Sequence, residues 1–434
     1  MRYFFLKRTA AAAMLLAAML MPVHGNAAIT LEECLDKARE NYPLVAKYGL
    51  VEHTARIELS DINKSWLPRV GVYAQATAQN KVPGLPEALQ NVLAQMGQES
   101  RGIGLVQYKA GVDVTQTVWD GGATRAQRAV ERARTHESQA ALDVEMYAVR
   151  ERVMNLFFGI LLLDEQIART ENTVTLLRAS RTLMESMLKG GVAMQSDVDM
   201  LEAQELSMLQ QVTSARNAAK GYRDMLALYV GENLDGEELV RPHAEMPADL
   251  ESRRPELELF RARNLVTDAR DAAVASSVMP KIGLFAQAYY GYPGFNYFDS
   301  MINRNLSFNV LAGVKVSWSI DAFYTRGNSR RRLALAAEST DADREVFLLN
   351  NRLQATSQVD AIEGLRAVMA DDNRIVGLRT SVRRSAESQL ANGVIDATAL
   401  LAKITDENQA RLTASYHEIE LLQAIFQLKN TLNR

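Results

Sequence analysis

Trp66-Leu67-Pro68-Arg69-Val70-Gly71 recurs 212 residues later as Val278-Met279-Pro280-Lys281-Ile282-Gly283. The match continues along the chain at offsets of 201 to 212, through Pro43 with Pro255, Asp120 with Asp321, and Gly191 with Gly393. A period near 200 residues is too long for solenoid repeats of about 20 to 50 residues. The sequence therefore predicts two equivalent halves, each with a helix, a strand pair, a very long helix, a turn and a return helix.

We expect four segments on this basis. They are a signal peptide at 1–28, a first repeat at 29–230, a linker at 231–252 and a second repeat at 253–434. Strands are expected at 69–80, 108–119, 281–292 and 306–320, and the turns that reverse the two long helices at 190–191 and 392–393.

The first 28 residues have the three parts of a secretory signal peptide: a basic start, an apolar core and a small-residue exit. Beyond them, no stretch approaches the 18 or so apolar residues of a spanning helix. Removing the three cations of the signal peptide would lower the formal net charge from −3 to −6. An acidic mature chain argues against nucleic-acid binding, because proteins that bind nucleic acids usually carry a basic patch or stripe.

Apolar residues recur from Leu142 to Leu188 in steps of three and four, interrupted only by Thr170 and Arg181. This 3.5-residue period is typical of a coiled-coil seam, here over about six heptads. A helix from about Thr124 to Lys189 would be about 100 Å long. Further apolar residues lie off the seam, which favours a ring of helices; the alternative is one hairpin in a soluble bundle.

The strand segments change to a period of two, most clearly between Leu306 and Ile320. Segments of about ten alternating residues are the signature of transmembrane barrel strands, although a water-soluble sandwich alternates in the same way. Four strands are too few to close a barrel, so chains must pool them, and three chains would give twelve. We expect Phe308, Val310, Val314, Val316 and Trp318 to face lipid, and Lys315 and Ser317 to face the lumen.

The expected hairpin tips are the turns that reverse the long helices. Glycines there supply the left-handed conformations that end a helix. The residues at these tips are Gly190, Gly191, Val192, Asn392, Gly393 and Val394. Asp197 and Asp199 follow the first tip and, in an assembly of several copies, are candidates for a ring of negative charge; the alternative is that they only cap the return helix together with Ser196.

Catalytic motifs are missing from the sequence. It contains no Walker glycine loop, no Gly-x-Ser-x-Gly elbow and no Cys-x-x-Cys pair. The four histidines beyond the signal peptide lack metal-ligand spacing, and the single cysteine, Cys34, is expected to be buried on a helix. We therefore expect no enzyme, no cofactor and no metal.

The chain resembles the TolC-like outer membrane efflux protein family over its whole mature length. The resemblance rests on loose motifs spread along the first repeat: Leu31 to Ala38 with Asn41-Tyr42-Pro43, Trp66-Leu67-Pro68, Val118-Trp119-Asp120-Gly121-Gly122, Lys189-Gly190-Gly191-Val192, and Ser196-Asp197-Val198. It implies a mostly α protein with a membrane part: a homotrimer with a twelve-stranded β-barrel continued by a long α-helical coiled-coil barrel. It also implies location in the outer membrane of a Gram-negative cell, extending into the periplasm.

The family role implied is export, either efflux or type I secretion. The partners implied are a periplasmic adaptor (membrane fusion protein), an inner membrane transporter and outer membrane lipid. The resemblance also makes the tip residues the candidate adaptor contacts and places Asp197 and Asp199 at the periplasmic entrance. Three features depart from the family pattern. Leu390 and Ile395 replace a tyrosine and an arginine that flank the second tip, the second strand exit lacks a glycine pair, and no lipid-anchoring cysteine is present. The alternative is a periplasmic coiled-coil adaptor or a structural protein of an export system.

Overall fold

A computed structural model describes residues 28–98 and 102–434, so the expected signal peptide lies outside the described residues except at its last position. The elements are α2 (Leu31–Asn41), α3 (Val45–Lys64), β1 (Arg69–Ala78), α4 (Glu87–Gln95), β2 (Val106–Trp119), α5 (Ala123–Lys189), α6 (Gln195–Val230), α7 (Glu256–Ser277), β3 (Lys281–Tyr292), α8 (Tyr297–Ile302), β4 (Ser307–Ser317), α9 (Ala322–Met369), α10 (Asp372–Ala391) and α11 (Ala397–Leu432). The expected fold class, mostly helical with one antiparallel sheet, is confirmed.

The chain forms two compact units. The strand unit comprises residues 48–141 and 256–345, and the hairpin unit comprises residues up to 47, 142–255 and 346–434. Helices α5 and α9 contribute to both units. Among the described residues, no helix is long and apolar enough to cross a membrane.

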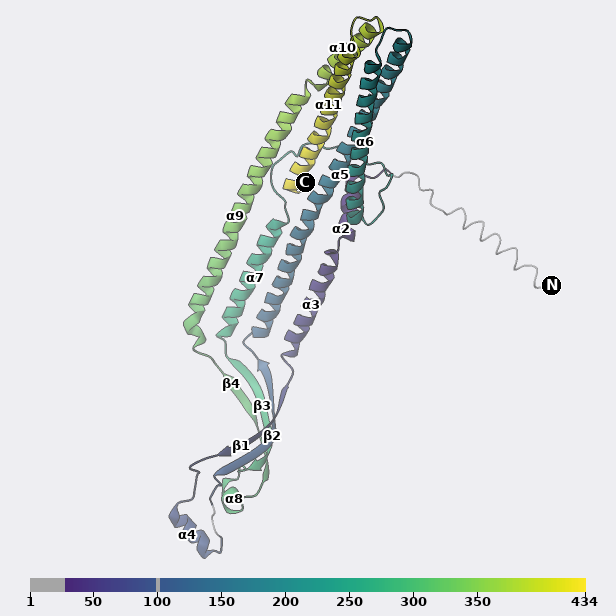
Figure 1. Cartoon of the computed structure of the whole chain (residues 1–434). Coiled ribbons are helices and arrows are strands. Elements are labelled where there is room, and N and C mark those ends of the chain that lie inside the picture. The colour runs from purple at the N-terminus through teal and green to yellow at the C-terminus, as the bar shows by residue number, and fades with distance from the viewer. Residues whose placement is uncertain (1–27, 99–101) are drawn as a thin grey trace, which may run out of the picture. The chain divides into compact units, whose positions relative to one another are not determined.

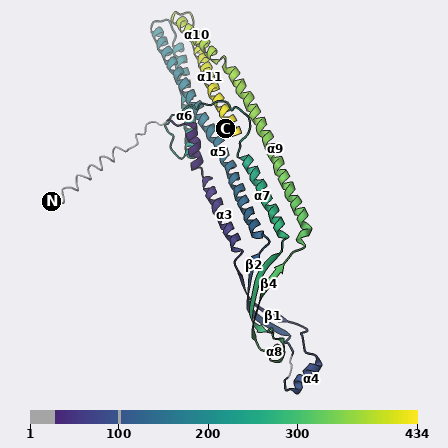
Figure 2. The ribbon, with the colours of Figure 1, turned by 180° about the vertical axis from the view of Figure 1, so that it is seen from behind.

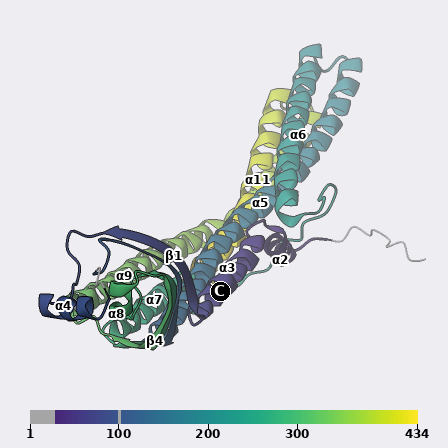
Figure 3. The same cartoon turned by 90° about the horizontal axis from the view of Figure 1, so that it is seen from below.

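The strand unit is built on a single four-stranded sheet of order β1-β2-β3-β4, in which every neighbouring pair is antiparallel. Helices α3, α5, α7 and α9 join the strands at one end of the sheet and run side by side in this order (Figures 1 and 2). The links that carry α4 and α8 lie at the other end. Viewed along the helices, the sheet is curved, with β1 and β4 at its edges (Figure 3).

The hairpin unit contains two helical hairpins, one formed by the end of α5 with α6 and the other by α10 with α11. They share one hydrophobic core, to which both contribute fully buried leucines such as Leu177, Leu201, Leu390 and Leu400. A second core surrounds Phe157 and Phe158 in the middle of α5, where they meet α2, α6 and α11.

Both hairpin tips use the same turn. Gly191 has φ +74° and Gly393 has φ +70°. The next residue in each repeat donates its N–H to a carbonyl five positions back, from Val192 to Met187 at 2.9 Å and from Val394 to Gln389 at 2.8 Å. This is the Schellman arrangement, which requires a left-handed residue and so favours glycine.

Two of the expected helices are interrupted, the opening helix and the long helix of the second repeat. The opening helix is α2 followed by α3, because Pro43 has no N–H to continue the ladder. In the second repeat, the helix expected to reach the tip at 392–393 is divided into α9 and α10. The break falls at Ala370 and Asp371, and Asp371, at the N-cap position of α10, makes no capping hydrogen bond with its side chain. Only α5 runs unbroken to its tip.

The strands differ from their expected bounds by a few residues. β1 ends at Ala78, β2 begins at Val106, and β4 covers Ser307–Ser317. Trp318, expected on the lipid face of β4, therefore lies just beyond the strand. Its indole N–H donates to the carbonyl of Val278 at 3.0 Å and its ring packs edge-on against Phe323.

Candidate membrane sheet and hairpin tips

The register of the sheet gathers the apolar rows of all four strands on one face. Side chains at directly paired positions point to the same side. The pairs Val72–Val112, Val112–Ala288 and Ala288–Val310 make one such row, and Leu284–Val314 and Ile282–Val316 belong to the same face. The opposite face carries the polar row and includes Lys315 and Ser317. We call these the apolar face and the polar face.

The apolar face is the more exposed of the two along β1 and β2. Val72 is 82% exposed, and in β4 Val314 is 66% exposed. The polar-face residues Tyr73, Lys109 and Asp113 are half-buried. A water-soluble sheet has the reverse arrangement, with its apolar side chains covered and its polar ones in water. This sheet therefore presents a surface that water does not favour.

The expected lipid-facing residues of β4 lie together on the apolar face. They are Phe308, Val310, Val314 and Val316, all more than half exposed. Large exposed apolar patches on a folded chain indicate a contact with a membrane or with protein.

Two aromatic residues near the strand ends pack into the connecting loops. Tyr292 is 4% exposed, and its hydroxyl accepts a hydrogen bond from the Gly104 N–H at 2.6 Å. It packs with the buried Ile103 and Met301. Tyr289, also buried, donates its hydroxyl to the carbonyl of Pro293 at 3.2 Å. Aromatic residues near strand ends are typical of the interfacial belt of a membrane barrel, but here the two tyrosines fasten the β1–β2 and β3–β4 links to the sheet.

The first strand exit is a tight, fully bonded turn. The Asp120 carboxylate accepts from the N–H of Gly122 at 2.9 Å and from the N–H and hydroxyl of Thr124 at 2.6 and 2.5 Å. Burial alone would raise the pKa of Asp120, but these hydrogen bonds outweigh it and lower the pKa. A Cβ on Gly121, which has φ +70°, would lie 2.4 Å from Cβ of Met279. Packing and a left-handed backbone thus both favour glycine at position 121, whereas Gly122 is favoured by its φ of +87° alone.

Asp197 and Asp199 have local partners at the start of α6. The Asp197 carboxylate accepts from the N–H of Met194, the N-cap residue, at 3.0 Å. Asp199 accepts from the Gln195 side chain at 2.7 Å. The expected cap by Ser196 with Asp199 is therefore wrong: α6 begins at Gln195, one residue before the serine. Both carboxylates remain at the exposed tip.

Leu390 and Ile395 have apolar surroundings. Leu390 is 2% exposed in the core shared by the two hairpins, and Ile395 packs against the same core. The second tip is thus held by hydrophobic packing at the two positions where the resemblance leads one to expect hydroxyl and guanidinium groups.

A buried ion pair occurs in both hairpins at equivalent places. Glu205 and Glu407 are 202 residues apart, the offset of the tip glycines, and so are Arg181 and Arg383. Glu407 is 4% exposed and accepts hydrogen bonds from Arg383, Arg411 and Thr380. Sequence reasoning missed this pair, although the shared offset could have revealed it.

The pair is looser in the first hairpin. Arg178 donates to Glu205 at 2.6 Å, but Arg181 Nε lies 3.6 Å from the second oxygen of Glu205. Neither that nitrogen nor that oxygen has a hydrogen-bond partner. The two hairpins thus share a buried glutamate but satisfy it to different degrees.

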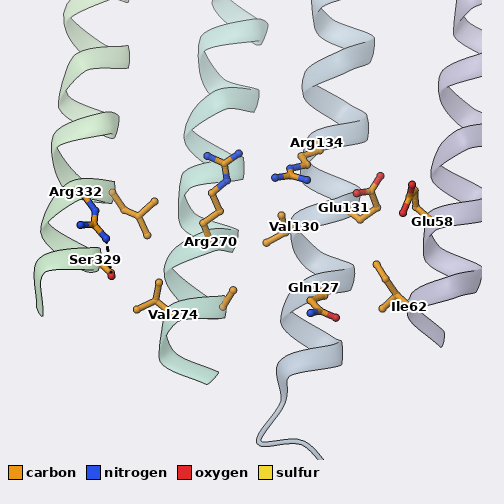
Figure 4. A pocket seen from close by; sticks show the side chains of 12 residues that line it. Glu58, Ile62, Gln127, Val130, Glu131, Arg134, Arg270, Val274, Ser329 and Arg332 are labelled. Atoms are coloured by element: carbon orange, nitrogen blue, oxygen red, sulfur yellow. Dashed lines mark hydrogen bonds between the residues drawn. The ribbon is translucent and has the colours of Figure 1, made fainter. Parts of the chain in front are cut away.

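A groove crosses one face of the four helices of the strand unit (Figure 4). It has a volume of about 730 Å³ and is open to solvent. Arg134, Arg270 and Arg332 line it from α5, α7 and α9, together with the carboxylates of Glu58 and Glu131. Because the groove is open, water solvates these opposite charges.

Three consecutive arginines, 330–332, lie more than two turns inside α9, which begins at Ala322. Arg330 makes two hydrogen bonds to the Asp271 carboxylate on α7, both 2.7 Å long. The helix dipole acts mainly on the first turn, so Asp271 pairs with a cation of the helix interior.

Metal and thiol chemistry are not indicated. Within residues 28–98 and 102–434, no group of three potential metal ligands is present. Cys34 is fully buried, and its burial raises the pKa of the thiol to about 12. The reactive species is the thiolate, so this cysteine is protonated and inert at neutral pH.

Comparisons with known proteins agree with this geometry. Residues 34–232 match a family model described as outer membrane efflux protein. A search of curated protein sequences gives no match. Two solved structures similar to the chain are the outer membrane protein VceC of Vibrio cholerae and the MtrE outer membrane channel of Neisseria gonorrhoeae. VceC has a TM-score of 0.65 and 13% identity, covering 93% of this chain and 95% of that chain. MtrE has a TM-score of 0.63 and 14% identity, covering 93% and 88%.

Proposed function

We infer from the match of residues 34–232 that the chain is a member of the outer membrane efflux protein family, and on that premise we propose that three copies pool their sheets into a twelve-stranded barrel and form an export channel. The chain is then an outer membrane channel that extends into the periplasm. The barrel removes the unpaired edges of β1 and β4, which lipid does not tolerate.

The exposed apolar face of the sheet carries this proposal. It spans all four strands, its members are more exposed than the polar residues between them in β1 and β2, and its register is continuous from Val72 to Val310. A periplasmic adaptor or a soluble coiled-coil protein would have no use for such a surface. This observation favours the channel over both alternatives.

Arginine substitution on the two faces of β4 tests the proposal. Val314→Arg places a charge on the apolar face, and in lipid this costs about 2–4 kcal/mol near the midplane. Ser317→Arg places the same charge on the polar face of the same strand and is the matched control. We expect Val314→Arg to reduce the heat-modifiable trimer in the outer membrane fraction severely, and Ser317→Arg to leave it near the parent level.

Either of two results would contradict the barrel. If both variants assemble like the parent protein, the apolar face does not meet lipid. If only Ser317→Arg fails, the two faces are reversed. A trimer mass measured in detergent for the parent protein checks the oligomeric state separately.

We further propose that the hairpin tips bind a periplasmic adaptor joined to an inner membrane transporter. The tips expose Val192 and Val394, each 69% accessible, on turns of identical geometry. Exposed apolar side chains at two matching turns give a partner two equivalent points of contact. Efflux of small molecules and type I secretion are both compatible with this arrangement.

A further inference from the structure

The charged residues of the sheet are few and unbalanced. Only five of the residues in β1, β2, β3 and β4 carry a charge: Arg69, Lys109, Asp113, Lys281 and Lys315. The pairing register puts all five on the polar face. Four cations and one carboxylate leave a net charge of +3 on this face, although the whole chain has a net charge of −3.

Three of the cations gather at the helix-side end of the sheet. Arg69 and Lys281 are the first residues of β1 and β3, and Lys315 lies two residues before the end of β4. In an antiparallel sheet of this order these positions share one end. Lys281 is paired with Ser317 and Lys315 with Gly283, so the two lysines are diagonal neighbours on adjacent strands. Among the described residues, none of the three forms an ion pair.

The remaining two charges are farther along the sheet. The Lys109 ammonium lies over the rings of Tyr73 and Tyr289, 5.9 and 5.5 Å from their centroids, so its partners are neutral. Asp113 extends over Gly71, where a Cβ would lie 2.8 Å from its carboxylate. Asp113 is a diagonal neighbour of Arg69, because Arg69 pairs with Thr115 and Gly71 pairs with Asp113. It lies farther from Lys281 and Lys315, since its partner on β3 is Gln287, and it does not neutralise these two lysines.

We propose that the polar face makes the barrel lumen select for anions, so that solutes bearing carboxylate, sulfonate or phosphate groups pass in preference to cations. This rests on the proposed trimeric barrel, in which three copies contribute a net charge of +9 to the strands. Low-dielectric walls focus the field of such charges into the lumen. The screening length of about 10 Å at 0.1 M salt is comparable with the distances across a small pore.

The effect expected on a charged probe is measurable. One fixed positive charge about 10 Å from a thiol in water should change the ratio of the reaction rates of a monoanionic and a monocationic reagent by about fourfold. The two lysines nearest Ser317 should together change that ratio by about tenfold at low salt, and added salt should reduce the change.

The test is thiol modification of the purified trimer carrying Ser317→Cys, with an anionic and a cationic methanethiosulfonate reagent. The buried Cys34, with its raised pKa, contributes no background. We expect the ratio of the anionic to the cationic reaction rate to be higher for Ser317→Cys than for a free thiol. Adding Lys281→Gln and Lys315→Gln should remove most of this preference, whereas Lys47→Gln with Arg56→Gln, on exposed positions outside the sheet, should not alter it.

Val316→Cys is the control on the neighbouring apolar position. We expect both reagents to modify it slowly, because lipid or detergent covers it. If Val316→Cys reacts as fast as Ser317→Cys, the barrel itself is wrong. If Val316→Cys is protected but Ser317→Cys shows no anion preference, or the preference survives the loss of both lysines, the barrel stands and the anion-selective lumen is overturned.

Discussion

Replacing the buried glutamate in each hairpin should loosen the second hairpin far more than the first. Glu407→Gln removes the charge that faces Arg383, whose side chain is only 12% exposed and retains Glu387 alone. Removing one partner of a fully buried pair costs about 3–5 kcal/mol. Because Arg411 is 41% exposed and can return to water, we expect about 2–3 kcal/mol here.

The equivalent change in the first hairpin provides a matched control. Glu205→Gln releases Arg178, which is already 56% exposed, and leaves Arg181 near Glu185 and Glu202, 3.6 Å from each. Exposed charges lose little when they lose a partner, so we expect about 1 kcal/mol or less. The two variants have the same chemistry at positions related by the repeat.

Hydrogen exchange of the detergent-purified trimer measures the difference directly. A tenfold change in the opening equilibrium corresponds to about 1.4 kcal/mol. Glu407→Gln should therefore speed amide exchange in the tip-side part of α10 and α11 by about 30- to 150-fold. Glu205→Gln should speed exchange in the first hairpin by about fivefold or less. In each variant the unaltered hairpin is the internal reference. Equal acceleration in the two hairpins, or more in the first, would refute the account of how these carboxylates are satisfied.

Acidification should act on the same group. Burial alone would raise the pKa of Glu407, but hydrogen bonds from Thr380, Arg411 and Arg383 outweigh it and lower the pKa from its ordinary value. The stabilisation is therefore complete above the ordinary glutamate pKa and is lost as the pH falls through the lowered one. Faster exchange of the second hairpin should appear only below the ordinary glutamate range.

Two predictions concern the tips. Photo-crosslinkers at Val192 and Val394 should capture a periplasmic protein in whole cells, and capture of no such protein would count against docking by the tips. Asp197→Asn combined with Asp199→Asn should shift the reversal potential of reconstituted channels in a salt gradient away from cations; an unchanged reversal potential would leave both residues as helix-start ligands only. The shift should be opposite in sign to that from neutralising the lysines of the sheet.

The sequence predicted well which residues of a strand lie on the same face, because side chains along a strand alternate with a period of two. Once Val314 is on one face, Lys315 and Val316 are determined, and pairing then aligns the rows of neighbouring strands. The ends of strands and helices were less predictable. Trp318 continues the alternation but lies outside β4, because strand ends depend on pairing with β3, which begins only at Lys281.

Residues that act through distant partners were predicted least well. Tyr292 fits an interfacial belt by its position in sequence, and only the loop of Gly104, 188 residues away, shows that its hydroxyl is used inside the strand unit. The partner of Asp372 is a second case. His417 on α11 lies 2.8 Å from the Asp372 carboxylate, a contact between two helices that no local pattern records.

The ion pairs of the hairpins show what an internal repeat can and cannot reveal. At the offset of 202, Glu205 and Arg181 recur as Glu407 and Arg383, but Arg178 recurs as Thr380, and Arg411 has a leucine as its counterpart. The extra guanidinium therefore comes from the outgoing helix in the first hairpin and from the return helix in the second. A buried carboxylate must be compensated, but any element that reaches it can do so. The internal repeat thus identifies the buried carboxylate of each hairpin, whereas the guanidinium groups that pair with it can be identified only from the structure. The first hairpin, in which one oxygen of Glu205 has no donor, is where a single new donor should add stability.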